Sequence, residues 1–214
     1  MALRIQTFVS GPLQTNVYLL EDTLKQQAVI VDPSFINPQV QEAAEKIMAS
    51  SVTFTAMWLT HAHLDHWHGS GWWQRTYNLP VYLHPDDQIW TEDPNEQAMW
   101  LNFPEPDVAT VDHWLEENQI LSVGDYQFQV IHTPGHSPGS VSFYCAQENL
   151  VIDGDVLFAG SVGRTDLPEC DASALRVSLR KLMSLPPETK VLSGHGPSTT
   201  IKEEIENNPF CRNL

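Results

Sequence analysis

Histidine and aspartate gather in one short segment of the sequence, residues 60–66, which reads Thr-His-Ala-His-Leu-Asp-His. Imidazoles and carboxylates bind divalent ions such as Zn²⁺, and an open metal site needs only three protein ligands. The segment follows an apolar run, residues 55–60, that is typical of a strand, so its side chains are expected on a loop held by rigid structure. The candidate ligands of this segment are His61, His63, Asp65 and His66.

Three further candidates follow other predicted strands, and each stands in a turn that contains glycine. Glycine permits the unusual backbone angles and close approaches that such turns need. A polar strand end exposed to solvent would explain one histidine pair, but packing does not explain several strand ends that each present a ligating side chain. These candidates are His136 in residues 133–139, Asp155 in residues 153–155 and His195 in residues 193–197.

The composition is that of an acidic, globular protein. The chain has 214 residues, with 11 lysines and arginines against 27 aspartates and glutamates, which gives a formal charge of −16. Such a chain repels phosphate backbones and contains no basic patch, so we expect a small-molecule substrate and no nucleic-acid partner. The sequence does not determine the oligomeric state. Apolar stretches fall short of the ~20 residues that span a bilayer, which predicts no membrane contact. The first residues lack the apolar core of a signal peptide, which predicts a cytoplasmic protein whose Cys145, Cys170 and Cys211 are reduced thiols.

Strand and helix patterns recur along the chain in an order that predicts a layered α/β fold. Apolar runs bounded by turns predict strands over residues 3–9, 17–21, 27–32, 55–60, 80–83, 120–123, 126–132, 140–145, 150–153 and 190–193. Helical spacing predicts helices over residues 38–47, 69–77, 171–183 and 199–206, with Asn37 and Asp171 as N-caps. Residues 85–118, rich in Asp, Glu, Pro and Trp, are expected to form a covering lobe of short helices and loops. We therefore expect one domain, residues 1–214, in which two sheets pack on each other between helices.

The order His-x-His-x-Asp-His, then an isolated His, an isolated Asp and a final His, resembles the signature of the metallo-β-lactamase fold superfamily. Within it the chain looks like the short glyoxalase II-like hydrolases, on the stretches 133–139, 160–168, 194–200 and 208–210. The resemblance covers essentially the whole chain. It implies a four-layer αββα sandwich with the site along the edge of two sheets.

The resemblance also implies a role for each candidate. One divalent metal ion would be held by His61, His63 and His136, a second by Asp65, His66 and His195, and Asp155 would bridge them. Zinc is the default metal for such ligands, and iron or manganese satisfies the same set. Two close metal ions lower the pKa of a shared water, and the metal-bound hydroxide, oriented by Asp65 as a catalytic residue, would cleave a small thioester such as a hydroxyacylglutathione.

Other functions within the superfamily stay open. Sulfur dioxygenases share the Gly-Arg-Thr-Asp stretch, residues 163–166, and use one Fe(II) held by two His and one Asp; a non-catalytic metal-binding protein is the second alternative. The complete ligand set favours a hydrolase over both. A β-lactamase is disfavoured, because antibiotic-hydrolysing relatives usually have Cys or Ser where this chain has Asp155. Glyoxalase II enzymes add a basic C-terminal extension, and only about twenty residues follow His195 here, so weak binding of glutathione conjugates is expected.

Residues around the cluster carry weaker signals. His68 is expected at the surface or behind the ligands, and Arg164 and Asp166 are expected to form a buried pair that supports them. Tryptophans of the covering lobe would either line a substrate pocket or pack beneath it; these are Trp90, Trp100 and Trp114. The histidines expected to be structural are His84, His113 and His132.

Overall fold

The first of two large sheets carries the N-terminal half of the chain. The computed structural model describes residues 3–212 and residue 214, and it orders this sheet β1-β2-β3-β4-β5-β6. Strands β1 to β3 pair antiparallel, and β3 to β6 pair parallel, which requires crossover connections between them. The bounds are β1 (Leu3–Ser10), β2 (Thr15–Asp22), β3 (Gln27–Val31), β4 (Thr53–Trp58), β5 (Val81–Leu83) and β6 (His113–Trp114).

The second large sheet carries the C-terminal half, in the order β14-β13-β10-β9-β8-β7. Only the pair β10 and β13 is parallel; the other neighbours run antiparallel. A separate hairpin pairs β11 (Leu157–Phe158) with β12 (Ser161–Val162). The bounds are β7 (Ile120–Val123), β8 (Tyr126–His132), β9 (Val141–Cys145), β10 (Leu150–Gly154), β13 (Lys190–Ser193) and β14 (Thr199–Thr200).

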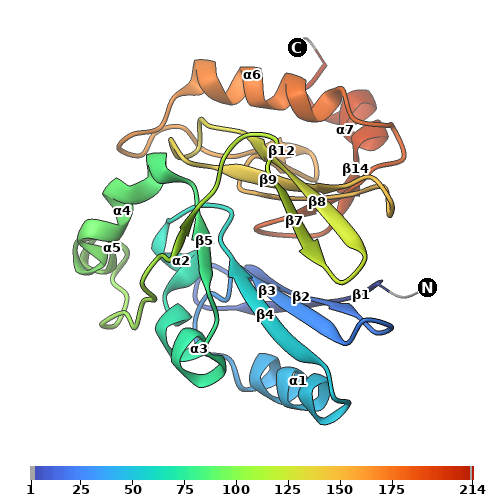
Figure 1. Ribbon diagram of the computed structural model, residues 1–214. Coiled ribbons are helices and arrows are strands. Elements are labelled where there is room, and N and C mark those ends of the chain that lie inside the picture. The colour runs from blue at the N-terminus through green and yellow to red at the C-terminus, as the bar shows by residue number, and fades with distance from the viewer. Residues whose placement is uncertain (1–2, 213) are drawn as a thin grey trace.

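Helices cover the outer face of each sheet, so the molecule has four layers. Figure 1 shows α1 (Pro38–Ala49) and α3 (Ser70–Tyr77) beneath the first sheet, and α6 (Ala172–Met183) and α7 (Ile201–Asn207) above the second. The two sheets face each other between these helices. The predicted α/β sandwich of the αββα type is confirmed.

The alternation of side chains along a strand explains how one sheet serves two cores. Leu19 of β2 packs in a cluster with Ile47 of α1, whereas its neighbour Leu20 packs with Phe128 and Phe143 of the second sheet. Successive strand residues point to opposite faces, so a strand covered on both sides needs apolar residues at nearly every position. This requirement accounts for the apolar, fully buried run of residues 17–20 in the middle of β2.

Side-chain caps begin the two longest helices, as the sequence predicts. The side chain of Asn37 accepts a hydrogen bond from the backbone N–H of Gln39, and Pro38 stands at the first helical position of α1. Asp171 accepts from the backbone N–H groups of Ser173 and Ala174 at the start of α6. Each cap satisfies donors that the first helical turn leaves free.

Short elements are where the structure departs from the sequence prediction. The covering segment does hold short helices, η1 (Pro85–Asp87), α4 (Gln88–Glu92) and α5 (Pro94–Leu101), but it ends in the unpredicted strand β6. The one-turn helix α2 (Leu64–Trp67) and the β11–β12 hairpin were also not predicted. Residues 199–200, expected at the start of a helix, instead pair with β13 as β14. A two-residue strand has no periodicity of its own and exists only because a partner strand is available.

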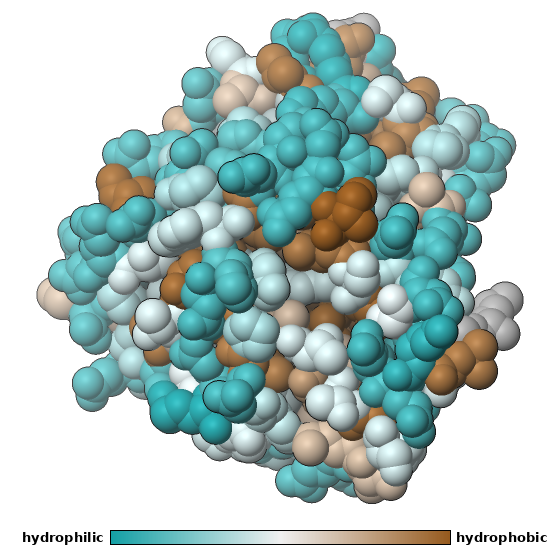
Figure 2. Space-filling model, in the orientation of Figure 1, coloured by the Kyte–Doolittle hydropathy of each residue, from teal (hydrophilic) through white to brown (hydrophobic). Residues whose placement is uncertain are grey.

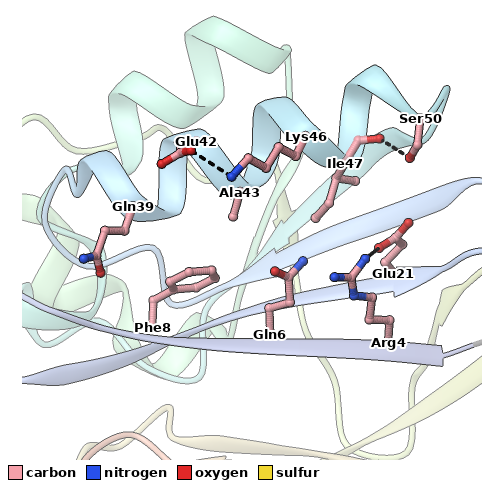
Figure 3. Close-up of a pocket in the computed structure, with 10 residues that line it drawn as sticks. All are labelled: Arg4, Gln6, Phe8, Glu21, Gln39, Glu42, Ala43, Lys46, Ile47 and Ser50. Atoms are coloured by element: carbon pink, nitrogen blue, oxygen red, sulfur yellow. Dashed lines mark hydrogen bonds and ion pairs between the residues drawn. The ribbon is translucent and has the colours of Figure 1, made fainter.

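The outer surfaces of the layers are mostly polar. Figure 2 shows one face on which hydrophilic residues predominate and apolar residues form small, separate groups. In the groove between β1 and α1, Lys46 pairs with Glu42 over 2.7 Å, and Arg4 lies 3.8 Å from Glu21 (Figure 3). These charges neutralise one another within the groove. None of the helices in the described residues is long and apolar enough to cross a membrane.

Candidate metal centre

Three of the predicted ligands converge at the ends of β4 and β8. His61 and His63 follow β4 of the first sheet, and His136 follows β8 of the second. Nδ1 of His63 lies 2.8 Å from Nε2 of His136, and the three residues offer ligand atoms that all lie within 4.8 Å of one another. This spacing suits three imidazoles around one ion.

A second group forms beside the first on α2 and after β13. Asp65 and His66 belong to α2, and His195 follows β13. Oδ2 of Asp65 lies 3.2 Å from Nε2 of His195 and 3.6 Å from Nε2 of His66. These three residues also offer ligand atoms within 4.8 Å of one another.

Asp155 lies between the two groups. One carboxylate oxygen is 3.4 Å from Nε2 of His66, and the other is 3.4 Å from Nε2 of both His136 and His195. Asp155 follows β10, so it enters the site from the second sheet, as His136 and His195 do. The structure thus brings all seven predicted site residues together at one edge of the two sheets; their action as ligands stays a prediction.

Four buried atoms of these residues have no hydrogen-bond partner within the described structure. They are Nε2 of His61, Nε2 of His63, Nε2 of His66 and Oδ1 of Asp155. A buried polar atom without a partner is costly. A divalent metal ion accepts the lone pairs of such atoms, so the unpaired atoms of His61, His66 and Asp155 and the His/Asp donor set both fit a metal centre. His63 faces His136 with Nδ1 rather than Nε2.

Burial and charge hold His61, His63 and Asp65 in the protonation states that bind a metal. Burial lowers the pKa of His61 well below its ordinary value and lowers that of His63 to about 3, so both rings are neutral and carry a free lone pair. Burial alone would raise the pKa of Asp65. The charge of His66 and a hydrogen bond from His195 outweigh it and lower the pKa of Asp65 to about 2.

Asp32, which the sequence analysis missed, orients two ligands from behind. Its carboxylate accepts hydrogen bonds from the backbone N–H and the hydroxyl of Thr60, over 2.8 and 2.7 Å, and it lies 3.0 Å from Nδ1 of His66. The hydroxyl of Thr60 in turn lies 3.0 Å from Nδ1 of His61. With Nδ1 engaged, each ring turns Nε2 toward the centre. The available signal was an aspartate directly after the apolar run of β3.

Asp87 joins the two loops that carry the first group of ligands. Its carboxylate accepts hydrogen bonds from the backbone N–H of Ala62 and the hydroxyl of Ser137, each over 2.8 Å, and from the backbone N–H of Gly139 over 2.6 Å. The first contact holds the loop of His61 and His63, and the other two hold the loop of His136. Nothing in the local sequence marks this role, because the partners lie far away along the chain.

The close packing of the centre requires glycine at position 194. A Cβ atom there would stand 2.1 Å from Oδ1 of Asp155 and 2.6 Å from Cε1 of His66. No side chain fits at these distances without moving a candidate ligand. The Gly-His-Gly turn after β13 therefore has a steric reason as well as a conformational one.

A cavity of about 610 Å³ opens over the cluster. Of the three tryptophans considered from the sequence, Trp90 and Trp100 line it, whereas Trp114 lies on β6 away from it. The cavity is lined by Leu13, His63, Asp65, Trp90, Gln97, Trp100, Leu101, His136, Asp155, Phe158, Ser161, Val162, Arg164, Leu167, Pro168 and His195.

The surroundings of the centre differ from the sequence prediction at Arg164 and agree with it at His68. Arg164 and Asp166 do form a pair, with nitrogen–oxygen distances of 2.7 and 2.8 Å, but the pair is exposed rather than buried. The support for His136 comes instead from the backbone carbonyl of Arg164, 3.0 Å from Nδ1 of the ring. His68 is buried, stacks on Phe35 at 3.9 Å and lies outside the cavity, as expected of a residue behind the ligands.

Another group of possible ligands, His84, Asp86 and His132, lies outside the centre. The rings of His84 and His132 are stacked 4.0 Å apart with an interplanar angle of 13°. An imidazole binds a metal along its ring plane, and two nearly parallel planes at this spacing do not meet at one ion. The two histidines therefore have the structural role that the sequence analysis assigned to them.

Comparison with known proteins places this centre in a family. The model of the Metallo-beta-lactamase superfamily matches residues 10–195. The chain is 39% identical to the probable metallo-hydrolase YqgX of Bacillus subtilis, over 94% of this chain and 93% of that protein. It is 32% identical to the hydroxyacylglutathione hydrolase GloC of Haemophilus influenzae, over 97% of this chain and 98% of that protein.

Solved structures of the same family superimpose closely on this chain. BLEG-1 B3 metallo-beta-lactamase has a TM-score of 0.87 and 40% identity, with 97% of this chain and 99% of that chain covered. TTHA1623, solved in a di-iron-bound form, has a TM-score of 0.84 and 39% identity, with 96% and 99% covered. The chain therefore belongs to the metallo-beta-lactamase superfamily, as a metal-dependent hydrolase whose site is built from histidine and aspartate.

Proposed function

We propose that the protein hydrolyses a small-molecule thioester, such as a hydroxyacylglutathione, in the cavity above the His/Asp cluster. The observation that carries this proposal is the central position of Asp155, 3.4 Å from imidazole nitrogens of both ligand groups. A carboxylate at that position can be shared by two metal ions. The similarity to GloC, a protein named as a hydroxyacylglutathione hydrolase, supports a thioester as the substrate.

The residues of the chain have separable tasks in this reaction. Divalent metal ions bound by the cluster would polarise the substrate carbonyl and lower the pKa of a water molecule. Asp65 is ionised at neutral pH and is fixed by a 2.9 Å hydrogen bond from the hydroxyl of Thr15, so it can accept a hydrogen bond from the attacking water and orient it. The leaving thiolate is a stable anion near neutral pH, so no side chain has to protonate it.

We propose zinc as the metal, because His and Asp ligands are typical of zinc sites. Iron satisfies the same ligand types, and the related TTHA1623 was solved with two iron ions. Metal analysis of protein that was purified without added metal decides between these ions.

The test combines metal content with substrate turnover on one preparation. Two metal ions per chain and the release of free thiol from S-lactoylglutathione support the proposal. A protein with two metal ions that releases no thiol from any thioester contradicts it. Hydrolysis of a penicillin in place of thioesters would indicate a β-lactamase. One iron per chain, with oxygen uptake on glutathione persulfide, would indicate a sulfur dioxygenase.

A further inference from the structure

An aromatic path leads from the candidate ligands to the surface. The ring of Trp90 meets that of His63 edge-on at 5.3 Å, and the ring of Trp100 meets that of Trp90 edge-on at 6.2 Å. Trp90 is buried, whereas Trp100 is 56% exposed although it stands at the mouth of the cavity. The α4–α5 side of the cavity is therefore an apolar wall that reaches solvent.

The cavity is apolar beside the second group of ligands as well. Phe158 of the β11–β12 hairpin lies 6.2 Å from His195, between ring centroids, and Val162 and Leu167 also line the cavity. Leu13, in the turn between β1 and β2, is 47% exposed at the rim. Apolar side chains that face water around a polar centre favour a ligand that covers them.

Free positive charge is scarce in this cavity. Among the described lining residues, Arg164 is the only lysine or arginine. Its Nε and Nη2 donate hydrogen bonds to the two carboxylate oxygens of Asp166, over 2.7 and 2.8 Å. A bidentate pair of this kind occupies the Nε/Nη2 edge of the guanidinium and offsets its charge, which weakens its attraction for a substrate carboxylate. The formal charge of −16 adds no attraction for an anion.

We propose that the cavity selects a substrate with an uncharged apolar chain, held by Trp90 and Trp100 together with Phe158 and Leu13. This inference rests on the proposed hydrolysis of thioesters and specifies which members of that class are preferred. The chain of the substrate covers the exposed rings while its carbonyl faces the His/Asp cluster. The two carboxylates of a glutathione conjugate find no matching cation in the described lining, so they contribute little to recognition.

The test is a pair of neutral thioester series on the metal-loaded enzyme. One series lengthens the acyl group of N-acetylcysteamine thioesters from acetyl through butyryl to hexanoyl, and the other lengthens the thiol part of an acetyl thioester. We expect kcat/KM to rise about threefold per added methylene in one of the two series, because each methylene leaves water on binding. The series that shows the rise identifies the end of the substrate that lies against the tryptophans.

Two variants test whether the apolar wall causes the dependence of kcat/KM on chain length. Trp100→Ala should abolish most of the rise, because it removes the ring that the longer chains would cover. Trp114→Ala removes an exposed tryptophan away from the cavity and should keep the rise intact. Circular dichroism verifies that both variants are folded. A flat response in both series, or a preference for S-lactoylglutathione over every neutral thioester, overturns the inference.

Binding separates a failure of this inference from a failure of the proposed function. Thioether analogues of the same two series lack the carbonyl and cannot be hydrolysed, and their binding can be followed by tryptophan fluorescence. Affinity that rises with chain length, in an enzyme that cleaves no thioester, supports the apolar recognition and rejects the thioesterase function. Turnover of thioesters with affinities that do not depend on chain length supports the function and rejects the apolar recognition.

Discussion

Asp32 lies 3.0 Å from Nδ1 of His66, and this contact joins the end of β3 to the helix that carries two candidate ligands. Both residues are fully enclosed. A carboxylate behind a histidine fixes the ring orientation and tautomer, and it increases the basicity of the nitrogen on the far side. The orientation of Nε2 of His66 therefore depends on a residue that does not itself enter the centre.

Asp32→Asn should weaken metal binding at the second group of ligands. The amide keeps the size of the side chain but loses its charge, so we expect metal affinity to fall about 10–100-fold. Metal titration followed by calorimetry measures the change. Asp22→Asn is the matched control, because Asp22 is another buried aspartate that accepts backbone hydrogen bonds far from the centre. Equal metal affinity in the Asp32 variant and the parent would contradict the role given to Asp32.

Asp155→Ala should remove most activity and at least one metal ion per chain. Without the central carboxylate, two cations held side by side would repel each other with less charge to compensate them. Elemental analysis of the purified variant and its thioesterase assay provide the measurement. Asp166→Ala, which removes an exposed carboxylate outside the cluster, should retain both metal ions. Two metal ions and full activity in the Asp155 variant would exclude this residue from the centre.

Asp87→Ala should lower stability more than a typical buried substitution. It leaves two backbone N–H groups and one hydroxyl without their acceptor, and each buried donor costs ~1–3 kcal/mol. We expect the free energy of unfolding to fall by about 3–5 kcal/mol, together with looser metal binding at the first group. Urea unfolding measures the loss. The exposed neighbour provides the control, since Asp86→Ala should change stability by less than about 0.5 kcal/mol.

His84 makes stability depend on pH. Burial, and then the stacked ring of His132, lower the pKa of His84 from the ordinary 6.5 to about 4. Because this folded-state pKa lies below that of the unfolded chain, protonation favours unfolding. The contribution of His84 is complete above pH ~6.5 and is lost as the pH falls towards ~4. Screening near the surface limits the loss to ~1–2 kcal/mol.

His84→Gln isolates this contribution. Urea unfolding of metal-free protein, compared near pH 7 and near pH 5, should show a smaller loss of stability for the variant than for the parent. His113→Gln removes an exposed histidine and should leave the loss unchanged. A parent and a His84 variant with the same pH dependence would refute the assignment.

The convergence of the candidate ligands could be expected from the sequence because most of them lie shortly after a strand. His136, Asp155 and His195 each follow a β-strand, and a recognisable apolar run marks most of these strands. The supporting residues could not be found in this way. Asp32 meets His66 from 34 positions away and Asp87 meets Ser137 from 50 positions away, and such contacts exist only after the chain has folded.

Regular elements and short ones also differ in how far the sequence predicts them. An N-cap residue and the helical spacing of apolar residues indicate the helix that begins at Pro38, so this helix is correctly predicted. The pairing of His113 with Tyr82, by contrast, is decided by the edge that β5 offers and not by a pattern in residues 113–114. The prediction that the Arg164–Asp166 pair is buried was wrong, because a salt bridge can form equally well in solvent.

The division of the ligands between the two sheets has a consequence for how the protein is made. Residues 61–66 leave the ribosome with the first sheet, whereas His136, Asp155 and His195 are synthesised later. A nascent chain therefore displays four of the seven candidate ligands before the remaining three exist. We expect tight metal binding only after the second sheet has docked, because each group of candidate ligands combines residues of both halves, and bound ions would then link the two halves.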